Sequence, residues 1–229
     1  MISFSVWSMF EQISIWLTSN FDIFIVGSML NEYYLGLYKT SMITVNSYMA
    51  IITAATTPVL FSALSRYQNN ETEFRSTFFK FQRLIAILIM PMGIGLFLYR
   101  NLATSILLGP QWIEASEFIG LWALTSSFTI VFGHYNSEVY RSKGKPKLSL
   151  LSQMIHLIFL IFILLIVAPM GFRFLYITRS LARFQGILVG FIILWINFRI
   201  STWSIIKNTY PMVVSAILMG VFGYVLQTF

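Results

Sequence analysis

The chain has 229 residues, of which 57% are hydrophobic and only 10% are charged, and its mean hydropathy is +0.77. A soluble domain of this size carries about 25% charged residues, so the composition excludes the soluble class and indicates a multi-pass membrane protein. The absence of cysteine excludes disulfides, thiolate metal sites and cysteine nucleophiles. The net charge of +7 is therefore interpreted as the Lys and Arg excess of cytoplasmic loops, not as a nucleic-acid surface.

Seven apolar segments are each close to the ~20 residues that an α-helix needs to cross the hydrocarbon core. They cover residues 5–30, 35–67, 73–99, 112–140, 148–168, 172–199 and 203–228. A shorter segment, residues 101–108, is expected to form an interfacial helix that ends at Gly109-Pro110. No stretch resembles a soluble domain or a linker, so we expect one all-α polytopic membrane domain over residues 1–229.

The first segment carries polar side chains that a lipid-facing helix would avoid. Four positions, at offsets of four, three and four, share one helix face: Glu11, Ile15, Thr18 and Asp22. Charges inside a bilayer usually point into a bundle or a wet cavity. Asp22 is expected about 12 Å from the outer helix end. It is interpreted either as an ion-coupling or substrate-facing group, or as one half of an ion pair that joins two helices. Glu11 lies nearer the inner interface.

Three motifs, in the same order and with similar spacing, resemble a known family of membrane proteins. They are Asn20-Phe21-Asp22 with Ile25-Val26-Gly27 and Leu35-Gly36-Leu37-Tyr38, then Pro58-Val59-Leu60-Phe61 with Leu64-Ser65-Arg66-Tyr67-Gln68, and then Leu107-Leu108-Gly109-Pro110-Gln111-Trp112. These motifs are similar to the seventh helix and following loop, the next helix end, and the loop before the tenth helix of the polysaccharide transporters. That family contains the O-antigen and teichuronic-acid flippases of the multidrug/oligosaccharidyl-lipid/polysaccharide superfamily.

The resemblance implies the second, carboxyl-terminal lobe of a flippase fold, because the chain matches the seventh to the thirteenth of about fourteen helices. Proteins of this family move an undecaprenyl-pyrophosphate-linked oligosaccharide across the bacterial plasma membrane by alternating access, coupled to H⁺ or Na⁺. The implied partners are the lipid-linked oligosaccharide and either an amino-terminal lobe or a second copy of the chain. The alternatives are a drug/cation antiporter or lipid II flippase of the same superfamily, or a non-transporting scaffold in a polysaccharide-assembly complex.

The second segment carries a polar stripe at offsets of seven, seven and four, made of Lys39, Asn46, Thr53 and Thr57. Hydroxyl and amide groups on such a stripe either join helices through hydrogen bonds or line a cavity opposite the Glu11–Asp22 face. Lys39 also fits a position at the outer interface.

Two basic residues of the sixth segment, Arg179 and Arg183, lie four residues apart. Like charges at this spacing repel one another unless an anion lies between them. Snorkelling to the outer interface explains both side chains. The alternative is a clamp for a lipid pyrophosphate, to which planar guanidinium groups are well suited.

No pattern in the sequence indicates an enzyme or a bound cofactor. There is no Gly-rich phosphate loop and no HExxH motif, and His134 and His156 have no partner at metal-ligand spacing. His134 and Glu138 form an i, i+4 pair near the inner end of the fourth segment, and an interfacial hydrogen bond is favoured there over a proton relay.

The loop charges predict the orientation. If the amino terminus lies in the cytoplasm, one side receives ten Lys and Arg residues and the other side receives three, with Arg179 and Arg183 unassigned. The positive-inside rule therefore places the amino terminus and residues 141–147 in the cytoplasm, and residues 109–112 outside.

Overall fold

A computed structural model describes residues 2–228, with side chains for residues 5–225. The described residues are almost entirely helical and include no strand, which confirms the all-α prediction. The long helices are α1 (Ile2–Met29), α2 (Glu32–Arg66), α3 (Glu71–Leu98), α5 (Ser116–Thr129), α7 (Pro146–Val167), α8 (Phe172–Phe198) and α9 (Thr202–Thr228). The short ones are α4 (Arg100–Leu107), η1 (Pro110–Ala115), η2 (Ile130–His134), α6 (Asn136–Ser142) and η3 (Ala168–Met170).

Six helical segments of the described chain are long and apolar enough to cross a membrane, so the chain is a multi-pass membrane protein. They are Glu32–Arg66, Glu71–Leu98, Pro110–Ser142, Pro146–Met170, Phe172–Phe198 and Thr202–Val225. The helix α1 has 28 residues but is not among the six. Polar residues, which include Gln12, Asn20 and Asp22, interrupt its apolar sequence.

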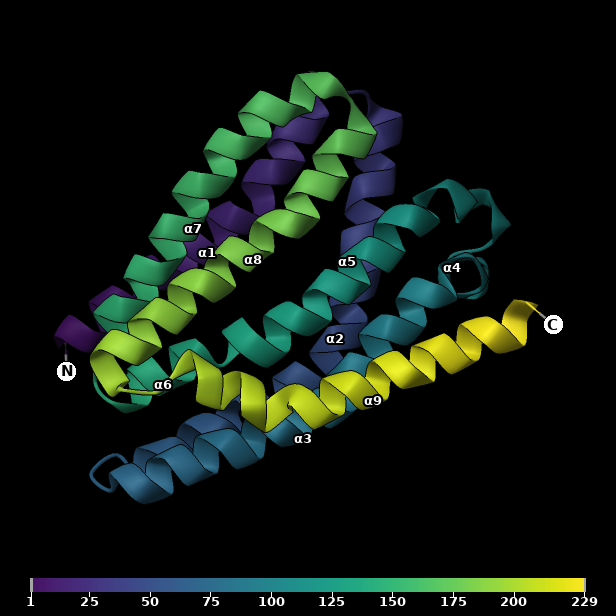
Figure 1. Cartoon of the computed structure of the whole chain (residues 1–229). Helices are drawn as coiled ribbons and strands as arrows, with labels where there is room; N and C mark the ends of the chain where they lie inside the picture. The colour runs from purple at the N-terminus through teal and green to yellow at the C-terminus, as the bar shows by residue number, and fades with distance from the viewer. Residues whose placement is uncertain (1, 229) are drawn as a thin grey trace.

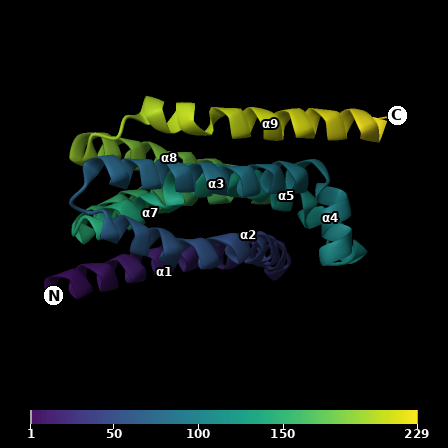
Figure 2. The same cartoon turned by 90° about the horizontal axis from the view of Figure 1, so that it is seen from below.

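The helices form two groups that share α5 (Figures 1 and 2). In one group, α7 packs between α1 and α8, and in the other, α3 packs between α5 and α9. The helix α5 also contacts α2 and α8, so it joins the groups. We call the end that holds the α2–α3, α6–α7 and α8–α9 connections the inner end, and the opposite end the outer end.

Short polar caps decide where several helices begin. The side chain of Asn31 accepts a hydrogen bond from the backbone N–H of Tyr34 at 3.0 Å, so α2 begins at Glu32, three residues before the expected start. Asn70 caps α3 in the same way through Glu73, at 3.2 Å. Such caps satisfy backbone N–H groups that have no partner inside the helix.

The segment expected as one helix over residues 112–140 is divided in the structure. It begins with the 3₁₀ turn η1, continues as α5, passes through the π turn η2, and ends as α6. The side chain of Gln82 on α3 donates to the carbonyl of Val131 at 3.2 Å, because a π turn changes the direction of backbone carbonyls. The hydrophobic pattern of this segment gives no sign of the extra residue in the turn.

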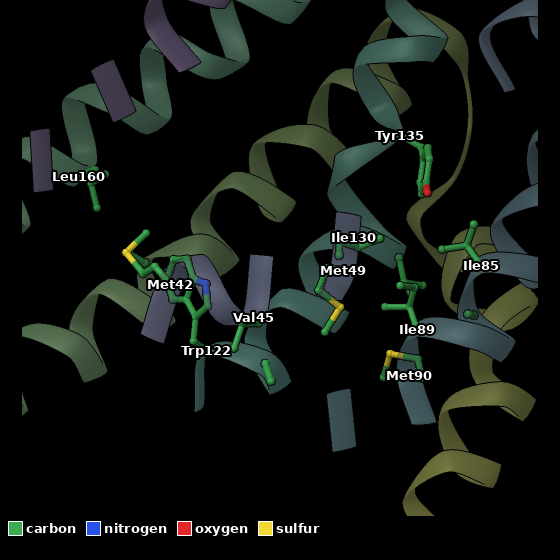
Figure 3. Packing of buried hydrophobic residues seen from close by; sticks show 14 of the residues in the cluster. Met42, Val45, Met49, Ile85, Ile89, Met90, Trp122, Ile130, Tyr135 and Leu160 are labelled. Carbon is green, nitrogen blue, oxygen red and sulfur yellow. The ribbon is translucent and has the colours of Figure 1, made fainter. Parts of the chain in front are cut away.

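An apolar core joins α2, α3 and α5 along their length (Figure 3). Met42, Val45 and Met49 of α2 are buried in it, each with at most 6% of its surface exposed, together with Trp122. Flexible Met side chains fill irregular gaps between helices. The core therefore fixes α2 against α5. It also sets the positions of the polar residues on the other sides of these two helices.

The surface of the inner end carries the whole net charge of the chain. Nine of the 15 Lys and Arg residues lie there, namely Arg66, Arg75, Lys80, Arg83, Lys143, Lys145, Lys147, Arg199 and Lys207, with two of the 8 acidic residues, Glu71 and Glu73. The other six basic and six acidic residues, all within the described chain, balance one another. This distribution agrees with the ten-to-three asymmetry on which the orientation is predicted.

We expect the α2–α3 connection to lie in the cytoplasm and the turn η1 to lie outside. Asn69 and Gln111 are exposed positions in these segments, whereas Ser142 is buried and would report poorly. In intact cells, an impermeant maleimide should label a Gln111→Cys variant and leave an Asn69→Cys variant unlabelled until the membrane is permeabilised. The reverse pattern in intact cells would show that the orientation is wrong.

Candidate functional site

A polar cavity of about 710 Å³ lies between α1, α2, α7, α8 and the divided segment α5–α6. Its volume is typical of small-molecule sites. Hydroxyl, amide and imidazole groups line it together with five charged residues. The charged residues are Glu11, Glu138, Arg141, Arg179 and Arg183. Since charges and amides are costly against lipid, this lining indicates a wet cavity inside the membrane-spanning part.

The cavity occupies the middle and the inner part of the bundle. On α8 its lining runs from Gly190 to Arg179, about 16 Å of helical rise. Outward of Arg179, closely packed aromatic rings fill the space between the helices. Phe118 stacks on Tyr38 at 5.1 Å and on Tyr176 at 5.2 Å between ring centroids, and none of these three residues lines the cavity. The cavity is therefore closed toward the outer end.

Asp22 and Arg179 form a buried ion pair at the closed end. The Nε atom of Arg179 donates to Asp22 Oδ2 at 2.7 Å, and the side chains are 5% and 0% exposed. The hydroxyl of Tyr38 donates to the same oxygen at 3.0 Å, and the backbone N–H of Ile23 donates to Asp22 Oδ1 at 2.8 Å. Of the two alternatives for Asp22, this geometry corresponds to an ion pair that joins two helices, α1 and α8. Asp22 itself does not line the cavity.

Arg183 lies one turn further along α8 and faces the cavity with no acidic partner. Its guanidinium lies 4.0 Å from the ring centroid of Trp122 and donates to the hydroxyl of Ser126. Among the described side chains, no carboxylate lies within 4.0 Å of it. Neither Arg183 nor Arg179 extends to the outer interface, so snorkelling does not account for them. The charge of Arg179 is balanced by Asp22, and the charge of Arg183 is not balanced.

Polar residues of α2 line the cavity opposite the two arginines. Asn46 accepts a hydrogen bond from the indole N–H of Trp122 at 3.0 Å, and Thr53 and Thr57 lie further toward the inner end. Lys39 belongs to the predicted stripe but lies outside the cavity, exposed on the outer part of α2. Three of the four stripe residues therefore line the cavity.

At the inner part of the cavity, two carboxylates share one guanidinium. Arg141 donates to both oxygens of Glu11, at 2.9 and 3.3 Å, and to Glu138 at 3.3 Å. Glu11 and Glu138 are 2% and 5% exposed. The cluster links α1 to α6 and carries a formal charge of −1. No group of three metal-ligating side chains occurs among the described residues.

Uncharged hydrogen bonds complete the cavity wall. Gln153 of α7 donates to Thr18 of α1 at 2.7 Å. His156 bonds Gln185 at 3.0 Å, so these contacts tie α7 to both of its neighbours. His134 lies 3.3 Å from the hydroxyl of Thr57, and not in a pair with Glu138. The patterns of the sequence do not identify Gln153, because one amide in an apolar helix carries no periodicity.

Replacing Asp22 by Asn should destabilise the protein by about 3–5 kcal/mol, because Arg179 would be left as a buried charge without a partner. Replacing both residues, as Asp22→Asn with Arg179→Gln, should recover part of this loss. Chemical unfolding in detergent measures both effects. An Asp22→Asn variant that unfolds like the wild type would refute this role for the ion pair.

Comparison with known proteins identifies one family. Residues 1–117, just over half of the chain, match the family described as polysaccharide biosynthesis protein. This region contains α1, α2, α3 and all three motifs on which the resemblance to polysaccharide transporters rests. Comparisons with curated proteins and with solved structures give no match. Because the matched region exceeds half of its length, the chain belongs to the polysaccharide biosynthesis protein family.

Proposed function

We propose that the chain is part of a flippase that moves undecaprenyl-pyrophosphate-linked polysaccharide repeat units across the bacterial plasma membrane. One observation carries the proposal: a polar cavity in the membrane-spanning part has an unbalanced guanidinium, Arg183, near its closed end. The family assignment, to polysaccharide biosynthesis, supports the same substrate class.

The cavity offers the two chemistries that such a substrate needs. Amides and hydroxyls, such as those of Gln12, Asn46 and Ser152, can exchange hydrogen bonds with sugar hydroxyls. Arg183 supplies a cation with N–H groups that can bind a phosphate oxygen. Arg179 is a weaker candidate for the second half of a clamp, because Asp22 already accepts from its Nε. A positive closed end is less suited to the cationic substrates of a drug antiporter.

Alternating access would require the closed end to open toward the outside. The residues that would have to separate are Asp22 of α1, Arg179 of α8, and the stacked rings of Tyr38 and Phe118. A hydrogen-bonded ion pair between two helices has two states, joined and apart, which suits a gate between cavity and exterior.

The proposal assigns the chain to the carboxyl-terminal lobe of the transporter and requires a second wall for the cavity. Gln12 and Ser19 of α1 and Asn46 of α2 are exposed and also line the cavity. Polar groups at this depth are penalised if they face lipid. An amino-terminal lobe, or a second copy of the chain, would cover them.

Coupling to H⁺ or Na⁺ is part of the proposal, and the geometry favours the Glu11–Arg141–Glu138 cluster over Asp22 as its site. The carboxylate of Asp22 is neutralised by Arg179. In the cluster, the single charge of Arg141 balances only one of the two carboxylates. Arg141 makes only one ion-pair contact with Glu138, at 3.3 Å. Glu138 therefore has free acceptor capacity for a proton or a monovalent cation at the inner part of the cavity.

Replacing Arg183 by Gln should lower export of lipid-linked oligosaccharide by about tenfold or more, the effect of losing a charge-assisted hydrogen bond of about 1.5–3 kcal/mol. Export should be measured as surface polysaccharide in a flippase-null strain, with and without a co-expressed amino-terminal lobe. Arg183→Lys, which keeps the charge, should retain part of the activity. The matched control is Arg173→Gln, because Arg173 lies on the same helix with a 75% exposed side chain. Wild-type export by Arg183→Gln at normal abundance would contradict the proposal.

A Glu138→Gln variant tests the coupling site. Arg141 keeps its two bonds to Glu11 in this variant, so assembly should be preserved. In inverted membrane vesicles, transport by the wild type should fall when an ionophore collapses the H⁺ or Na⁺ gradient. Transport by the variant should be slow and indifferent to that ionophore. An equal ionophore response in both proteins would exclude Glu138 as the coupling group.

A further inference from the structure

A second hollow lies between α3 and α9, and no residue lines both it and the large cavity. It measures about 420 Å³ and is almost entirely apolar. The residues that form this α3–α9 groove include Ile87 and Pro91 of α3 and Pro211, Met212, Ser215 and Met219 of α9. The groove lies between two helices that are long and apolar enough to span a membrane.

Contacts at both ends hold the two helices together and leave the groove between them. Toward the inner end, Asn208 donates to the carbonyl of Phe79 at 2.9 Å. Toward the outer end, Gly220 packs so closely that a Cβ atom there would lie 2.8 Å from Ile94. Between these contacts, Pro91 and Pro211 line the groove from opposite helices. Each proline lacks a backbone N–H and so interrupts the hydrogen-bond ladder of its helix at this level.

The groove continues into a basic surface along one face of each helix. On α3, the positions Lys80, Arg83, Ile87 and Pro91 follow at offsets of three, four and four. On α9, the positions Lys207, Pro211, Ser215 and Met219 follow at offsets of four. Residues at these offsets share a helix face. Each face therefore begins with cations near the inner end and becomes apolar about one turn deeper.

These three cations are exposed and have no acidic partner. No carboxylate among the described side chains lies within 4.0 Å of Lys80, Arg83 or Lys207. The guanidinium of Arg83 donates to Asn208 at 3.0 Å, which places it beside α9, next to the residue that follows Lys207. The acidic residues of α3, Glu71 and Glu73, lie in its first turn.

We propose that the α3–α9 groove binds an anionic phospholipid of the inner leaflet. Its phosphate lies among Lys80, Arg83 and Lys207, and one acyl chain fills the groove. Basic pockets between membrane helices on the cytoplasmic side suit anionic head groups. A partner helix is less suited, because the three cations beside the apolar groove match an anionic group joined to an apolar chain, which one phospholipid provides. The inference is independent of the flippase proposal, since it uses neither the cavity nor its residues.

Native mass spectrometry of the purified chain, titrated with phosphatidylglycerol or phosphatidylcholine, tests the inference. The wild type should bind phosphatidylglycerol more tightly. The double variant Arg83→Gln with Lys207→Gln should lose about thirtyfold in its affinity for phosphatidylglycerol, from about 1 kcal/mol for each cation. Ser215→Phe, which fills the groove, should weaken the binding of both lipids.

The matched control is Arg66→Gln with Lys147→Gln, which removes the same charge from the inner end but away from the groove. This control should bind phosphatidylglycerol as the wild type does. An equal loss in the control would show diffuse charge attraction and overturn the inference. Wild-type affinity in the Arg83 and Lys207 variant, or equal binding of both lipids by the wild type, would overturn it as well.

Discussion

A carboxylate with no exposed surface is stable in the middle of this bundle because a guanidinium from another helix reaches it. Asp22 and Arg179 are separated by most of the chain, and their bond at 2.7 Å fixes α1 against α8. Desolvating two charges costs several kcal/mol for each ion, which the pair offsets only with good geometry and additional donors. Tyr38 and the N–H of Ile23 supply those donors. The pair also separates the cavity from the packed aromatic rings beyond it, so the depth of the cavity depends on this contact.

The polar interior divides into three charge groups with different balances. The pair of Asp22 and Arg179 is neutral, Arg183 is positive, and the cluster of Glu11, Glu138 and Arg141 is negative. The last two both line the cavity, at opposite ends of it. An anionic substrate and a cationic coupling ion would thus have separate places, and both could bind before the ion pair between α1 and α8 opens.

Much of the fold could be predicted from sequence patterns, because membrane helices are recognised by their length and hydropathy. The polar face of Glu11, Thr18 and Asp22 was predictable from helical offsets, and Glu11 and Thr18 do line the cavity. Pairing across helices was not predictable. From the sequence alone, Arg141 is one of the loop charges that predict the orientation. Trp122 is one of many aromatic residues. The π turn η2 leaves no mark in the hydrophobic pattern of the sequence. It changes the direction of the segment, so that His134 and Glu138 line the cavity.

The one-sided charge of the bundle couples it to the membrane potential. Moving one elementary charge through 100 mV involves about 2.3 kcal/mol. The seven net positive charges of the inner surface would therefore cost about 16 kcal/mol to carry outward against a potential of 100 mV, negative inside. The neutral remainder of the chain adds nothing to this work. In the predicted orientation this electrical work adds to the desolvation cost that keeps the basic end out of the bilayer.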